Sequence, residues 1–295
     1  MKYVKYSNMP VHLRWDLYPV PHEGHKAHYG GSYFEEVDWW KKPRHMDKVS
    51  ELKHMVPEMA FLVAVKEHNP SLWLRTFPFH FGMYCLIGCL ALLVLGAVME
   101  LAGLHVCANA NAIGATVHYG TGIVGLIGAG LGTLGALGLL ARRLFDENLK
   151  DFTKPSDIFN LLFLLSIFVL ILILGIANPS LSTLREYVRS VMVFNLSVAP
   201  SEPAGVAAVI LASLAVAYIP LTHMSHFVIK WFTYHKIRWD DEPNLRGGAI
   251  EGKVMECLNY PVSWSADHVQ PKGEKRTWAQ IATEPMPGQA KKESK

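Results

Sequence analysis

The pattern of apolar and polar positions divides the chain into four long apolar segments separated by polar stretches. The segments cover residues 77–104, 113–141, 158–177 and 205–227. Each is long enough to cross the hydrocarbon core of a bilayer, which takes about 20 residues in a helix. The sequence therefore predicts an all-α membrane protein, a bundle of four transmembrane helices.

Polar segments flank and connect the apolar ones. We expect residues 1–75 to form a docking segment, residues 76–239 the four-span bundle, and residues 240–295 a tail. Tryptophans and tyrosines give the first segment enough apolar surface to pack on a partner, while its prolines interrupt long helices. Short helices are expected at residues 51–66 and, at the membrane surface, at residues 181–193.

Basic residues are unevenly distributed between the loops. The loop at 142–155 holds four Lys or Arg residues, whereas the loop at 105–112 holds none. Loops on the cytoplasmic side carry the excess of Lys and Arg. We therefore expect a multi-pass protein of the inner (cytoplasmic) membrane, with the middle loop and both termini in the cytoplasm.

Composition narrows the functional classes. The chain has 295 residues, 51% of them apolar, and a mean hydropathy of +0.18, values typical of a membrane bundle with sizeable aqueous segments. The formal net charge is only +3, and we expect no nucleic-acid partner. The four cysteines form no CxxC or CxxCH pattern, so neither an iron–sulfur cluster nor a covalently attached haem is expected. The first 75 residues also lack the pattern of a cleavable signal peptide.

Two histidines near the ends of apolar segments are candidate metal ligands. His80 lies five residues after Arg75, and His226 lies four residues before Lys230. At ~1.5 Å of rise per residue, each sits about 6–8 Å inside its flanking charge, and the two helices run in opposite directions. Two imidazoles at one depth suit axial ligation of a b-type haem held by coordination alone. The alternative is a pair of interfacial histidines that extend toward lipid headgroups.

Other residues near these two histidines extend the candidate haem site. His223 shares a helical face with His226, and is either the ligand in its place or a hydrogen-bond partner of a haem propionate. Arg75 and Lys230 are placed to meet the propionates. Gly82, beside His80, leaves room for the porphyrin.

A stripe of glycines runs along the second apolar segment at helical spacing, on the same face as His118. Its members are Gly122, Gly125, Gly128, Gly132 and Gly135. Such a stripe allows close approach either of another helix or of a flat macrocycle, and Gly125 and Gly128 are the expected macrocycle contacts. His118 lies 24 residues before Arg142, or ~36 Å along a helix, so it is predicted near the outer face. There it is either a quinone-site residue or the ligand of a second haem.

Several short motifs carry a resemblance to known membrane cytochromes. The run 125–144, the Phe79-His80 pair, Thr153-Lys-Pro-Ser-Asp157 and Pro220 six residues before His226 resemble the gamma subunit of respiratory nitrate reductase, a cytochrome b that oxidises quinol. Closer still, Thr222-His-Met-Ser-His226-Phe and Thr233-Tyr-His-Lys-Ile-Arg-Trp-Asp240-Asp241 look like the cytochrome b subunits of heterodisulfide-reductase-like complexes of the Dsr and Tmc types. The second histidine pair of that family would fall near Leu90 and Ala208, so one haem b is expected rather than two.

The resemblance implies a function. In these relatives the cytochrome passes electrons between menaquinone and a cytoplasmic iron–sulfur subunit related to heterodisulfide reductase, with a multihaem cytochrome c as a further partner on the outer side. We therefore predict the haem b-containing, quinone-reactive subunit of an anaerobic respiratory complex. Two other classes remain open: a haem-free membrane anchor that docks a soluble enzyme, and a small transporter with histidines as proton relays.

Overall fold

The computed structural model of the chain describes residues 2–7, 19–24, 32–43, 46–195, 197–240, 242–262 and 275–283. Within these ranges every regular element is a helix, apart from one isolated bridge between Pro261 and Thr277. The chain divides into two compact units, Met55–Met224 and the combination of Met1–His54 with Ser225–Lys295. These divisions differ from the expected segment boundaries after residues 75 and 239.

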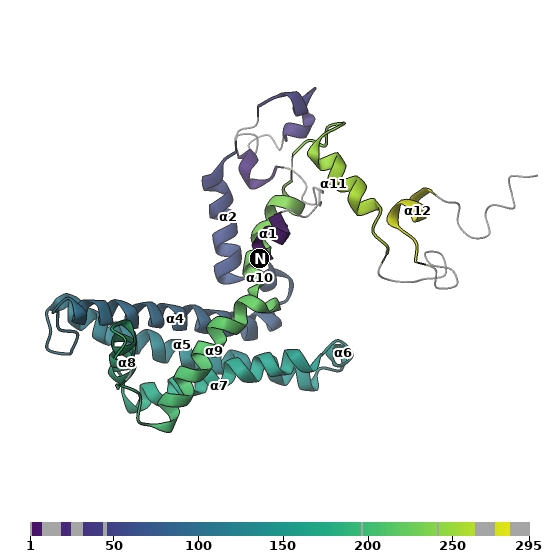
Figure 1. The fold of residues 1–295 in the computed structure, drawn as a ribbon. Helices are drawn as coiled ribbons and strands as arrows, with labels where there is room; N and C mark the ends of the chain where they lie inside the picture. The colour runs from purple at the N-terminus through teal and green to yellow at the C-terminus, as the bar shows by residue number, and fades with distance from the viewer. Residues whose placement is uncertain are drawn as a thin grey trace, which may run out of the picture. The chain divides into compact units, whose positions relative to one another are not determined.

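Four helices of the unit Met55–Met224 are long and apolar enough to cross a membrane (Figure 1). They are α4 (Pro70–Leu101), α5 (Ala112–Phe145), α7 (Pro155–Ala177) and α9 (Pro203–Leu221). Three of them begin with proline, which has no N–H to leave unpaired in the first turn and a backbone angle already suited to a helix. The prediction of an all-α, four-span membrane protein is confirmed.

Helices α4 and α5 lie side by side and nearly touch along a glycine seam (Figure 1). A Cβ atom added to Gly82 would lie 2.5 Å from the backbone nitrogen of Gly132, and one added to Gly128 would lie 2.6 Å from the Cβ of Cys85. A Cβ on Gly135 would collide with the backbone of Phe79. Because the obstacle is mostly backbone, only glycine permits this separation of the two helices.

One apolar cluster joins all four spanning helices. Phe79 of α4, Ala136 of α5, Phe168 of α7 and Ala215 of α9 are buried together in it. The ring of Phe168 occupies the space that a side chain at Gly132 would need. Many other large apolar side chains of the spanning helices point outward, as expected where lipid rather than water is the solvent.

The end of the fourth apolar segment differs from the prediction of one helix through residue 227. Helix α9 stops at Leu221, just after Pro220, and Thr222 is extended (φ −106°, ψ −178°). Proline lacks the N–H for the helical ladder, and its ring clashes with the carbonyl one turn earlier. The chain then continues through η5 (His223–Ser225), α10 (His226–Phe232) and a π-helical turn, η6 (Thr233–Arg238). A count of helical rise therefore does not give the depth of His226.

The predicted surface helix is present as α8 (Ser182–Met192), whereas the helix expected at residues 51–66 is two helices. These are α2 (Lys48–Phe61) and α3 (Val63–His68), separated by Leu62 with a positive φ of 54°. The remaining described helices are short: α1 (Lys2–Ser7), η1 (Pro21–Glu23), η3 (Tyr33–Glu35), η4 (Trp39–Lys41), α6 (Glu147–Lys150), α11 (Ala249–Leu258) and α12 (Trp278–Thr283).

The unit formed by Met1–His54 and Ser225–Lys295 has its own buried centre. Trp239 is 2% exposed and packs on Tyr234, with ring centroids 4.5 Å apart. The carboxylate of Glu51 lies beside two imidazoles, 3.3 Å from Nδ1 of His22 and 3.5 Å from Nε2 of His235. The contact of Glu51 with His235 joins the N-terminal part of the sequence to a residue that was expected in the bundle. The unit therefore combines residues 1–54 of the expected docking segment with the end of the expected bundle and the tail.

Candidate functional site

His80 is oriented by its own helix. Its half-buried ring places Nδ1 2.8 Å from the carbonyl oxygen of Thr76, one turn earlier in α4. A carbonyl only accepts hydrogen bonds, so Nδ1 carries the proton and the lone pair of the neutral ring is on Nε2. Histidines that ligate metals are commonly held in this way, with the second ring nitrogen bonded to a carbonyl or carboxylate. The backbone of α4 thus selects the tautomer that coordination through Nε2 requires.

Aromatic residues share the His80 face of α4. Trp73, Phe77, Phe81 and Tyr84 recur at helical spacing on the side of His80. Trp73 stacks on Phe77 with ring centroids 4.7 Å apart, and Phe77 stacks on Phe81 at 5.5 Å. This aromatic face was not identified from the sequence, although the spacing of its members is visible there.

The end of α2 lies against this aromatic face. Nε1 of Trp73 donates to the carbonyl of Phe61 at 2.8 Å, and the Tyr84 hydroxyl donates to the carbonyl of Met59 at 3.0 Å. Both acceptors are near the C-terminus of α2, where helical carbonyls lack partners within the helix. These two bonds fix the surroundings of His80 on one side.

The glycines of the candidate site lie elsewhere. Gly82 is two residues from His80 and therefore points about 200° around α4, into the seam with α5. Gly128 meets Cys85, and Gly125 meets the side chains of Leu181 and Cys89. Close packing of protein atoms accounts for these three glycines, so a macrocycle could approach them only if α4 moved away from α5.

Arg75 turns back along its own helix. Its Nη1 donates to the carbonyl and to the hydroxyl of Ser71, both at 2.8 Å. The aliphatic stem of Arg75 packs over Gly138 of α5, whose added Cβ would lie 3.1 Å from Cγ. Arg75 therefore serves the packing of α4 on α5.

The remaining candidate ligands are in separate elements. His223 is in η5, within Met55–Met224. His226 begins α10 with an exposed side chain, and Lys230 is half-buried one turn later, both in the other unit. His80 and His226 thus belong to different units.

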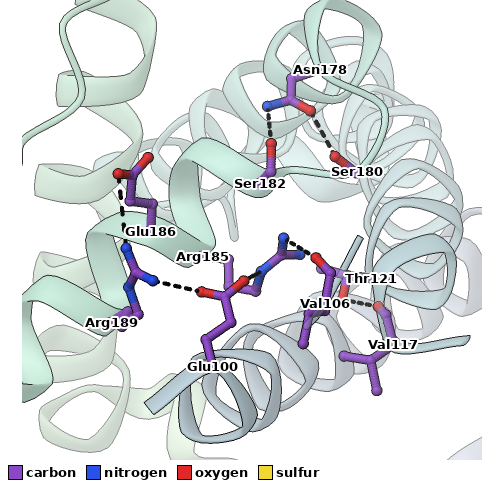
Figure 2. Close-up of polar contacts among 10 residues, drawn as sticks. All are labelled: Glu100, Val106, Val117, Thr121, Asn178, Ser180, Ser182, Arg185, Glu186 and Arg189. Atoms are coloured by element: carbon purple, nitrogen blue, oxygen red, sulfur yellow. Dashed lines mark hydrogen bonds and ion pairs between the residues drawn. The ribbon is translucent and has the colours of Figure 1, made fainter. Parts of the chain in front are cut away.

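At the other end of α4 lies a polar cluster that sequence reasoning missed (Figure 2). Glu100, in the last turn of α4, accepts a hydrogen bond from Nε of Arg185 in α8 at 2.8 Å, and its second oxygen lies 3.4 Å from Nη1 of Arg189. Nη2 of Arg185 donates to the carbonyl of Val106 at 2.7 Å. Glu100 is the only acidic residue in the four apolar segments of the sequence, and this isolated charge is the sequence feature that could have indicated the cluster.

The cluster attaches α8 to the spanning helices. The side chain of Arg185 is only 5% exposed, so its charge depends on the carboxylate of Glu100. The loop before α8 is equally constrained. The amide of Asn178 donates to Ser182 at 2.9 Å (Figure 2). A Cβ on Gly122 of α5 would collide with the carbonyl of Pro179. Helix α8 is therefore held against α4 and α5 by both charge and backbone contact.

His118 lies in the second turn of α5, beside this cluster. Its imidazole is within hydrogen-bonding range of the backbone of Val106 and within electrostatic range of Arg185. Nδ1 of His118 is buried and has no hydrogen-bond partner among the described residues, and the same is true of Nη1 of Arg185. The structure thus places His118 at the end of the bundle opposite to His80, as the sequence predicts from the antiparallel course of α4 and α5.

Within the described part of the chain, no group of three or more His, Cys, Asp or Glu residues is arranged to hold a metal ion. All four cysteines are free thiols.

Comparisons with known proteins identify no relative. No protein-family model matches the chain, and neither a curated protein nor a solved structure matches it. The class that the fold defines is therefore that of a four-span, all-α, multi-pass membrane protein.

Proposed function

We propose that the chain is a membrane cytochrome b, the quinone-reactive subunit of an anaerobic respiratory complex, with His80 and His226 as the axial ligands of one haem b. The observation that carries the proposal is the bond between Nδ1 of His80 and the carbonyl of Thr76. It leaves the lone pair on Nε2, as axial ligation needs. Bound haem supplies one-electron transfer, and the protein supplies the ligands and the surroundings that set the potential.

The residues around His80 fit a flat apolar group on one side only. Trp73, Phe77 and Phe81 provide an aromatic face next to the ring. We therefore place the proposed haem on this face of α4, and not on the seam of Gly82, Gly125 and Gly128.

His226 enters the proposal on the sequence pattern that it shares with cytochrome b subunits. His223 is retained as the residue that replaces His226 as ligand or that bonds a propionate. Lys230 is retained as a propionate partner, because a lysine near the membrane boundary is well suited to bind a carboxylate. Arg75 is a weaker candidate, since its guanidinium is already bonded to Ser71.

The wider assignment follows the resemblance and the distribution of charge. We propose that menaquinone reacts at the end of the bundle that contains His118, and that the unit containing both termini docks a cytoplasmic iron–sulfur subunit related to heterodisulfide reductase. The basic loop at 142–155 supports an inner-membrane orientation with cytoplasmic termini. A multihaem cytochrome c is the proposed partner on the outer side.

A haem-free membrane anchor is the second candidate, because the glycine seam is filled by helix packing. The reduced-minus-oxidised absorption spectrum of the purified full chain in detergent distinguishes the two. We expect the narrow α-band of a low-spin b-type haem. A flat spectrum from protein that is folded and was produced with an ample haem supply would favour the anchor.

A further inference from the structure

We propose that Arg185 and His118 form a single binding site for the carbonyl oxygen of a quinone headgroup, with α8 carrying half of the site. This inference rests on the proposed function and assigns a residue, Arg185, that no sequence pattern indicates. It starts from two buried nitrogens of the bundle that have no hydrogen-bond partner among the described residues, Nη1 of Arg185 and Nδ1 of His118.

The guanidinium of Arg185 is fixed in place. Nε is bonded to Glu100 at 2.8 Å and Nη2 to the carbonyl of Val106 at 2.7 Å, so two of its three nitrogens are already committed (Figure 2). A planar guanidinium held at two points has no freedom to turn the third nitrogen elsewhere. Nη1 therefore presents its N–H groups in one direction, and a buried donor of this kind requires an acceptor.

His118 borders the same space from α5. Its imidazole is within hydrogen-bonding range of the backbone of Val106, the residue whose carbonyl accepts from Arg185. Nδ1 of His118 is buried and has no hydrogen-bond partner in the described part of the chain. Arg185 and His118, from different helices, thus both approach the backbone of Val106, and each has one buried nitrogen without a described partner. An oxygen between them would accept from Arg185 and accept from, or receive the proton of, the imidazole.

The charges nearby favour a neutral ligand. Glu100 and Glu186 balance Arg185 and Arg189 in the ion pairs of α8, so the cluster has no excess positive charge to attract an anion. Neither unpartnered nitrogen is accessible to water. A hydrated carboxylate or phosphate would have to lose its water to enter, whereas a carbonyl on an apolar ring loses much less. A lipid-soluble quinone has this chemistry.

Equilibrium binding of a tritiated short-chain menaquinone to the purified full chain in detergent tests the inference. The variants are Arg185→Lys, which keeps the charge opposite Glu100 but removes the forked donor, and His118→Phe, which keeps a flat ring without nitrogens. Thr116→Val is the matched control, because Thr116 lies on an exposed part of the same end of α5. We expect saturable binding that weakens at least about tenfold in both variants, the effect of losing one buried hydrogen bond, and is unchanged in the control.

Competition with an excess of naphthoate separates a neutral carbonyl from an anion of similar shape. The inference predicts little competition, and strong competition would overturn it. It is also overturned if the wild type shows no saturable binding, or if Arg185→Lys and His118→Phe both bind as tightly as the control. Should one variant fail to fold, the other decides alone.

The haem spectrum of the same samples keeps the two proposals apart. A haem-containing wild type that does not bind the quinone contradicts this inference and leaves the cytochrome assignment standing. A haem-free protein whose quinone binding depends on Arg185 and His118 contradicts the cytochrome assignment and leaves this inference standing.

Discussion

His80 and His118 lie at opposite ends of the helix pair α4 and α5, and they differ in the hydrogen bonding of Nδ1. Nδ1 of His80 is bonded to the carbonyl of Thr76 in its own helix, whereas Nδ1 of His118 is buried and has no hydrogen-bond partner within the described ranges. The first imidazole is therefore oriented before any ligand arrives, and the second has a hydrogen bond still to make. This difference supports our proposal of a fixed ligand at one end of the bundle and an exchangeable one at the other.

The surroundings of the two histidines also differ, since one ring lies on an aromatic face and the other lies beside a charged cluster. His80 is on an aromatic face with Trp73 and Phe77, and its Nδ1 is bonded to a backbone carbonyl. His118 is beside the charged pair of Glu100 and Arg185. An aromatic face suits a large flat group, whereas a charged cluster at a helix end suits the exchange of hydrogen bonds and protons.

The largest effect on stability is expected when the Glu100–Arg185 ion pair at the His118 end is removed. Glu100→Leu leaves the buried guanidinium of Arg185 without its carboxylate, and removal of one partner of a buried ion pair typically costs about 3–5 kcal/mol. We expect α8 to detach while the His80 end stays intact. Hydrogen exchange should rise across Ser182–Met192, and Tyr84 near His80 should keep its protection.

Glu186→Gln serves as the control, because that carboxylate is 55% exposed and its pair with Arg189 is long, at 4.0 Å. It should change exchange very little. Equal exchange of α8 in Glu100→Leu and Glu186→Gln would show that the buried pair does not hold the helix.

A substitution in the glycine seam between α4 and α5 should have a smaller effect on stability, and this effect should reach both the His80 end and the His118 end. Gly82→Ala places a Cβ 2.5 Å from the backbone nitrogen of Gly132, where only a shift of whole helices gives relief. Overpacking of this kind costs about 1–3 kcal/mol. Gly130→Ala is the matched control, since nothing lies within 4 Å of its added Cβ. The melting temperature should fall for the first and stay or rise for the second, and an equal fall would contradict the packing.

The smallest effect concerns α2, whose last turn contacts the His80 face. Hydrogen bonds from the hydroxyl and backbone N–H of Ser50 lower the pKa of Asp47 below its ordinary value of 3.8. A carboxyl with a lowered folded pKa stabilises the helix above pH 3.8, and this contribution is lost as the pH falls through the folded pKa. Asp47→Asn keeps a capping oxygen but removes the charge. The helicity of α2 in Asp47→Asn should therefore differ from that of the wild type near pH 6 and match it near pH 2. A difference that persists at low pH would contradict the explanation that the charge of Asp47 stabilises the helix.

Much of the fold is predictable because lipid imposes simple rules. Apolar runs long enough to span predicted the ends of α5 and α7 to within four residues, whereas α4 begins seven residues earlier than expected. The two arginines of α8 did not hide its amphipathic pattern. The break after Pro220 was missed because apolarity continues past it, although the proline itself was visible. The ion pair of Glu100 with Arg185 could not be predicted from the sequence. The two residues are 85 positions apart, and only the packing of α8 brings them together.

The glycines show the same division. Their helical spacing predicted a face that something approaches closely, and both another helix and a macrocycle satisfied that pattern. The structure fills the face with α4, with residues 179–181 before and at the start of α8, and with Phe168 of α7. The position of Gly82 opposite to His80 already follows from their two-residue spacing. Spacing along one helix thus predicts a close contact but not the partner.

The haem content of three proteins, measured by pyridine haemochrome per chain, tests the central difference between the two histidines most directly. The proteins are the wild type, His80→Ala and His118→Ala, each purified as the full chain and checked for membrane insertion. We expect one haem per chain in the wild type and in His118→Ala, and none in His80→Ala, because the ring of His80, unlike that of His118, is oriented as a ligand by its own helix. Full haem in His80→Ala, or loss of haem in His118→Ala alone, would contradict the account.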